Sequence, residues 1–130
     1  MNKIELNKST CELIEEGVVY VVYKDKVDIE LKDVIETRVI SNQLTEGKPY
    51  VSIYESGPET IITKEAREIS SKNGDIANRK ALAIVVSNLA HRLIVNFFIN
   101  MNKHIYPMKA FNTKEEAIKW AKQYLKAHLA

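Results

Sequence analysis

Hydrophobic and polar residues follow one another along this chain with two different periods. Runs of β-branched and aromatic residues, or strict alternation, predict strands at residues 11–15, 18–23, 50–55, 81–86 and 104–111. Apolar residues that recur every three or four positions predict helices at residues 31–44, 63–69, 88–102 and 113–127, the last three counted from their capping residues. The element order is therefore β-β-α-β-α-β-α-β-α. Strands that alternate with helices favour right-handed crossovers, so we expect an α/β domain with a mostly parallel five-stranded sheet.

The first two predicted strands form an N-terminal β-hairpin. Gly17 lies in the turn between them, and glycine adopts a positive φ without steric cost. Residues 18–23 are apolar on both faces, which predicts that other layers cover both sides of this strand. Pro107 interrupts the last strand and has no amide donor, so we expect that strand near an edge. The chain is expected to be one domain over residues 1–130, with residues 1–9 as a flexible arm.

Three of the helices have a predicted inward face. For the final helix this face is a stripe with two aromatic residues beside it: Ala117, Ile118, Ala121, Leu125, Trp120 and Tyr124. For the first helix it consists of Leu31, Val34, Ile35 and Val39, and for the short second helix of Ala66 and Ile69. Thr113 and Glu116 have the spacing of a capping box at the start of the final helix.

The composition is that of an ordinary globular domain. The 130 residues are 45% hydrophobic and 28% charged, and the formal net charge is only +2. No strong field attracts nucleic acid or an anionic membrane. The single cysteine, Cys11, excludes an internal disulfide and a thiolate metal cage, and suits a reducing cytoplasm. We see no signal peptide in the first residues, and no apolar run approaches the roughly 20 residues of a spanning helix.

The helix predicted at residues 88–102 is unusual because it is apolar nearly all round. Its broad apolar face consists of Ala90, Leu93, Ile94, Phe97, Phe98 and Met101, and its narrow polar stripe of Arg92, Asn96 and Asn100. In one interpretation the whole helix is core. In the other, Val95 and Ile99, with Asn96 beside them, lie outside the core face and meet a second subunit or an apolar ligand.

The start of this helix also has a pattern that suits a small anion. Asn88, His91 and Arg92 follow the strand at residues 81–86, and ligands of open α/β sheets bind beyond the carboxyl ends of strands. Free amides at a helix start attract anions, and His91 and Arg92 add donors. The alternative is that Asn88 is only a cap and that His91 and Arg92 are first-turn residues in solvent.

No other pattern points to catalysis. The three histidines lack metal-ligand spacing, and the chain has no glycine-rich nucleotide loop and no G-x-S-x-G motif. We therefore expect no metal, no cofactor and no enzymatic activity. Cys11 falls on a predicted strand, where it is a small hydrophobe. The tyrosines on strands have no basic cluster beside them, so we interpret them as packing residues and expect no nucleic-acid partner.

Five segments carry a resemblance to a known family: residues 62–68, 79–87, 96–100, 106–111 and 116–120. They resemble a group of uncharacterised bacterial STAS-type proteins with a SpoIIAA-like fold. The resemblance spans most of the chain from about residue 10 and implies a β-α superhelical domain. Better-known relatives are anti-sigma-factor antagonists, which are switched by phosphorylation of a serine at the start of the helix after the third strand. More distant similarity reaches the CRAL-TRIO lipid carriers.

The switch motif of that family, Asp-Ser-Ser-Gly, is altered in this chain. The corresponding segment is Thr63-Lys64-Glu65-Ala66, so Lys64 or Glu65 replaces the acceptor serine, and the Thr63 hydroxyl is needed as a helix cap. The resemblance then implies a cytoplasmic regulatory or protein-interaction module without this serine, which binds a protein partner or forms a homodimer. The alternative is a CRAL-TRIO-like carrier or sensor of a small apolar or anionic ligand.

Overall fold

A six-stranded sheet forms the centre of the molecule. The computed structural model describes residues 3–72, 78–101 and 107–129. The sheet holds, in spatial order, β1 (Lys3–Glu5), β2 (Ser9–Glu15), β3 (Val18–Tyr23), β5 (Tyr50–Glu55), β7 (Arg79–Val85) and β8 (Met108–Phe111). The pairs from β3 to β8 are all parallel, whereas β1, β2 and β3 pair antiparallel. The predicted mostly parallel sheet with a leading hairpin is confirmed.

The strand count differs from the prediction in two places. Strand β1 lies within the segment expected as a flexible arm, and pairs Ile4 with Cys11 of β2. A second, parallel sheet joins β4 (Asp28–Ile29) to β6 (Ile61–Ile62). Strands of two or three residues are too short to show a period. They form here because β1 pairs with the neighbouring strand β2, and β4 pairs with β6 far along the chain.

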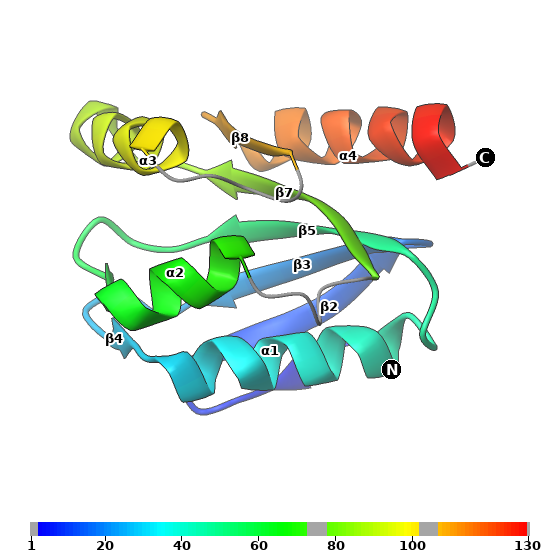
Figure 1. The fold of residues 1–130 in the computed structure, drawn as a ribbon, viewed down its shortest axis with the longest axis horizontal. Helices are drawn as coiled ribbons and strands as arrows, with labels where there is room; N and C mark the ends of the chain where they lie inside the picture. Colours follow the sequence, from blue (N-terminus) through cyan, green and yellow to red (C-terminus); the bar gives the residue numbers. More distant parts are fainter. Residues whose placement is uncertain (1–2, 73–77, 102–106, 130) are drawn as a thin grey trace.

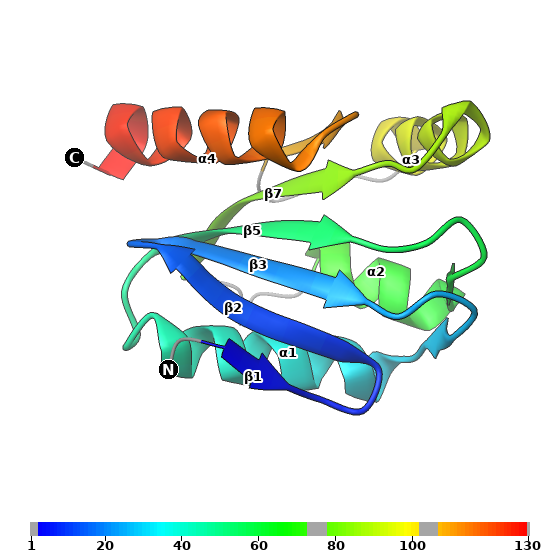
Figure 2. The same ribbon diagram turned by 180° about the vertical axis from the view of Figure 1, so that it is seen from behind.

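The four helices lie on different parts of the sheet. Figures 1 and 2 show α1 (Leu31–Leu44) and α2 (Lys64–Lys72) on one face, and α4 (Lys114–Leu129) on the other. Helix α3 (Leu89–Met101) lies at the far end, where it contacts the edge strand β8. Val18 and Val19 of β3 point to opposite faces, and both are fully buried, so the predicted covering of this strand from both sides is confirmed.

Helices α1 and α4 differ in how well their inward faces were predicted. The α4 stripe is confirmed, with Ala117 and Ala121 fully buried against β5 and β7. The limits of α1 are also confirmed, but its predicted face is wrong in part: Ile35 is 44% exposed and Val39 is 50% exposed.

The buried side of α1 is instead largely polar: Asp33, Thr37, Arg38 and Ser41 accompany Val34. Hydroxyl groups can face the interior here because the helix backbone accepts their hydrogen bonds. Thr37 donates to the carbonyl of Val34 at 2.9 Å, and Ser41 donates to the carbonyl of Thr37 at 2.6 Å.

Two predicted signals are confirmed, whereas two boundaries shift: α2 continues to Lys72, past the predicted end at residue 69, and β7 lies at Arg79–Val85 instead of residues 81–86. Gly17 adopts a φ of +77° in the hairpin turn. Pro107 precedes β8, which is the edge strand expected from that proline. Ala66 is fully buried in α2, while the side chain of Ile69 and the predicted strand start at residue 104 lie outside the described residues.

Candidate functional site

Helix α3 exposes large apolar side chains to solvent. Leu89 is 71% exposed, Leu93 61%, Ile94 68% and Phe97 66%. Leu89, Leu93 and Phe97 are four residues apart and form one stripe, with Ala90 and Ile94 beside it. We call these five residues the α3 apolar face. Four large side chains at about two-thirds exposure leave on the order of 500 Å² of apolar surface, at the upper end of what a monomer usually exposes.

The opposite side of α3 attaches the helix to the sheet. Val95 is only 9% exposed and packs with Val86 and Ala110, and Ile84 and Ile99 lie against the same cluster. Residues at the carboxyl ends of β7 and β8 thus cover a narrow stripe of the helix.

The predicted interface is therefore wrong at Val95, and the most exposed side of α3 is a different one. Val95 faces the interior, and Ile99 packs beside it and is only partly exposed, as is Asn96. Leu93 and Phe97, expected in the core, face solvent. A helix that is apolar nearly all round satisfies the periodicity in several orientations, and an edge strand needs only a narrow stripe of it. The prediction of more apolar surface than the core covers is correct, but it applies to the other face.

The predicted anion site lies at the start of α3, and its side chains bind one another and their neighbours. The side-chain oxygen of Asn88 accepts the His91 amide at 2.8 Å, which is the predicted N-cap. Nδ1 of His91 accepts the Ser87 amide at 3.0 Å, and Arg92 donates to Oδ1 of Asn112 at 2.8 Å. Partial burial lowers the pKa of His91 below its ordinary value of 6.5, which suits a neutral ring that accepts. The geometry favours the cap interpretation, and anion binding stays a prediction.

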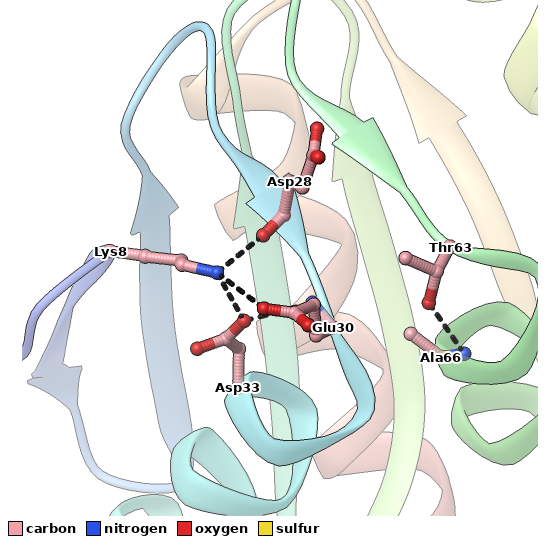
Figure 3. A network of polar contacts seen from close by, with 6 residues as sticks. All are labelled: Lys8, Asp28, Glu30, Asp33, Thr63 and Ala66. Atoms are coloured by element: carbon pink, nitrogen blue, oxygen red, sulfur yellow. Dashed lines mark hydrogen bonds and ion pairs between the residues drawn. The ribbon is translucent and has the colours of Figure 1, made fainter.

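The switch-region equivalents lie at the start of α2. Thr63 caps this helix, because its hydroxyl oxygen accepts the Ala66 amide at 3.2 Å (Figure 3). Its own amide donates to the carbonyl of Ile29 at 3.0 Å, which ties the helix start to β4. Lys64 and Glu65 are exposed.

A polar network that was missed from the sequence lies beside this region. Figure 3 shows the Lys8 amine between three acceptors: the Asp28 carbonyl at 2.7 Å, Glu30 Oε1 at 3.1 Å and Asp33 Oδ2 at 3.0 Å. The hydrogen bonds to Asp33 and Glu30 raise the pKa of Lys8 above its ordinary value. Asp33 also accepts the Glu30 amide at 2.8 Å. The spacing of Glu30 and Asp33 signals a helix start, but nothing local points to Lys8. The network fastens α1 to the loop before β2.

Other reactive groups are buried or lie apart. Cys11 is fully buried, and burial raises the pKa of its thiol to about 12, so it is not a nucleophile near neutral pH. Among the described residues, no three histidine, cysteine or acidic side chains gather closely enough to hold a metal ion. Over the same part of the chain, no helix is long and apolar enough to cross a membrane.

An open hollow of about 700 Å³ lies at the other end of the strands, where β3 and β5 begin. Its lining includes Leu13, Gly17, Leu44, Pro49 and Leu125. Ligands of open α/β sheets bind at the carboxyl ends of the strands, whereas this hollow lies at the amino ends. It is therefore a weaker candidate than the α3 apolar face.

Comparison with known proteins establishes the class of fold and then the family. The structure is similar to that of an uncharacterised protein of the DUF3478 family from Shewanella loihica PV-4, which has a SpoIIAA-like fold. The TM-score is 0.53 at 17% sequence identity, over 91% of this chain and 98% of that chain. This chain is thus an α/β protein with a SpoIIAA-like fold. It belongs to the family described as a domain of unknown function (DUF7793), whose model matches residues 13–125. No curated protein matches the chain.

Proposed function

We propose that this protein is a non-catalytic regulatory module of STAS type from the bacterial cytoplasm, which acts by binding protein through the α3 apolar face. The observation that carries the proposal is the exposure of Leu89, Leu93, Ile94 and Phe97 on one side of a helix whose other side already meets the sheet. Contiguous apolar patches of this size mark contacts with other molecules. The matching surface of the partner protein is then apolar and uncharged, as the α3 apolar face is.

A protein surface fits this face better than a membrane or a small ligand. Helices that lie on membranes carry lysine and arginine on their polar side, whereas residues 89–101 contain no lysine and only one arginine. That residue, Arg92, donates to Asn112. The polar groups at the start of α3 likewise bond within the chain, so they offer little to an anionic ligand.

The absence of catalysis in this proposal is supported by a contact between a hydroxyl and an imidazole at the start of α3. Ser87 Oγ lies 2.9 Å from His91 Nδ1. A general base needs a free lone pair on that nitrogen, and the Ser87 amide already donates to it. We therefore interpret the contact between Ser87 and His91 as a structural one that stabilises the start of α3. The proposal also includes no phosphorylation switch at the start of α2, because the hydroxyl of this segment, that of Thr63, is engaged as the helix cap.

A site-specific cross-link in cells tests the interaction function. A benzophenone amino acid at position 97, on the exposed α3 apolar face, is expected to form a covalent adduct with a protein on illumination. The matched control is position 39, which is also an exposed apolar helix position but lies on α1, away from α3 (Figure 1). Adducts at neither position, or equal adducts at both, would contradict the proposal. A small molecule in the native mass spectrum that is lost on Leu93→Asp would favour the carrier function.

A further inference from the structure

We propose that the occupant of the α3 apolar face is a second copy of this chain, bound with its α3 antiparallel about a two-fold axis at Leu93. This inference rests on the interaction function proposed above and names its partner. Three features of the face support it: the symmetry of its stripe, its lack of charge and its area.

The stripe matches itself when it is turned around. Leu93 lies midway between Leu89 and Phe97, four residues from each, so an antiparallel copy places Leu93 against Leu93 and Leu89 against Phe97. Contacts of this kind are isologous, which is the usual form in homodimers. Packed helix axes lie about 8–10 Å apart, which brings these side chains into contact. The stripe extends about 12 Å along the helix, so all three positions meet together.

Charge does not oppose this pairing. The five residues of the face are uncharged, so a copy of the face meets no like charge. Arg92 is turned to Asn112. Antiparallel helices also bring the positive end of each dipole near the negative end of the other, which is favourable.

The area suffices for a reversible dimer. Two faces of on the order of 500 Å² remove at most about 1,000 Å² from water when fully covered, which is the size of weak, transient interfaces. We therefore expect a dissociation constant on the order of 10 µM and a monomer–dimer equilibrium at working concentrations.

The molar mass of the purified protein in solution tests whether two copies pair. Sedimentation equilibrium from about 1 to 500 µM should show a rise from the 14.9 kDa monomer to twice that mass. Leu93→Asp should remain monomeric throughout, since Leu93 is 61% exposed and the substitution leaves the core intact. The control Val39→Asp places the same charge at a half-exposed position of α1 and should dimerise as the wild type does.

Cysteine cross-linking tests the geometry separately. Leu93→Cys should form a disulfide dimer on mild oxidation, because a residue at the axis faces its own copy within disulfide reach. Leu89→Cys and Phe97→Cys should cross-link when the two variants are mixed, and poorly alone. Cys11 is fully buried and does not compete.

The outcomes separate this inference from the function on which it rests. A mass that stays at 14.9 kDa to 500 µM overturns self-pairing, and adducts of position 97 with a different protein would then leave the interaction function standing. A dimer that survives Leu93→Asp overturns the proposed surface. A dimer that Leu93→Cys and the mixed variants fail to trap overturns the antiparallel arrangement.

Discussion

Two neighbouring residues of α3 give a sharp test of how the helix lies. Val95 is 9% exposed and packs with Val86 and Ala110, whereas Ile94 is 68% exposed. Val95→Ala removes two buried carbon atoms, worth about 1.6 kcal/mol of transfer free energy, and leaves a small cavity. The higher helix propensity of alanine offsets about 0.5 kcal/mol. We expect Val95→Ala to lower the free energy of unfolding by about 1.5 kcal/mol.

The matched variant is Ile94→Ala, which removes more atoms at the next position. Those atoms face solvent, so little transfer free energy is lost, and the gain in helix propensity opposes it. We expect the free energy of unfolding to change by less than about 0.5 kcal/mol.

Urea unfolding followed by circular dichroism, at a protein concentration of about 1 µM, tenfold below the expected dissociation constant, measures both variants. With a slope of about 2 kcal/mol per molar urea, Val95→Ala should lower the unfolding midpoint by roughly 0.7 M. The sequence pattern alone predicts the reverse order, with Ile94 in the core. If Ile94→Ala proves the more destabilising variant, our orientation of α3 is refuted.

Three further predictions concern single groups. Asn88→Ala should lower the free energy of unfolding by about 1 kcal/mol through loss of the cap, and Asn88→Asp should restore most of it; equal unfolding curves for all three proteins would contradict the cap. His91 has a lowered pKa in the folded state, so its contribution to stability is present above pH 6.5 and is lost as the pH falls through the folded pKa. His91→Gln should flatten this acid-side loss in urea midpoints measured from pH 7 to pH 5. The Cys11 thiol, with a pKa of about 12 and no exposure, should react with a thiol reagent at pH 8 only when the chain unfolds, and rapid labelling of the folded protein would show that strand β2 opens.

Helix α4 shows where sequence reasoning succeeds. Its inward stripe of Ala117, Ala121 and Leu125 is confirmed because the positions on its opposite side are mostly lysines, glutamates and a glutamine, which leaves one orientation free of buried charge. The parallel strands were likewise recognised from their β-branched residues and the turns between them. Contrast between two faces is the information that periodicity carries.

Helix α1 shows a first reason for failure. Its inner side holds Thr37 and Ser41, whose hydroxyl groups donate to helix carbonyls, and the buried Arg38. A hydropathy pattern treats such residues as solvent-facing because it cannot represent the hydrogen bonds that permit their burial. The Lys8 network could not be predicted from the sequence for a related reason. Lys8 and Asp33 are 25 positions apart in the sequence, and only the folded chain brings them together.

Helix α3 differs from both, because its apolar residues exceed what its attachment to the sheet uses. Val95 and Ile99 suffice to fasten it to β7 and β8. The fold makes no demand on the character of Leu89, Leu93 and Phe97, since glutamate, glutamine or lysine at these exposed positions would form the helix nearly as well. Exposed leucine and phenylalanine in one stripe lower solubility and add nothing to the core of the monomer. The pairing proposed above would account for their apolar character, and the symmetry of the stripe about Leu93 suits a second copy of the same helix.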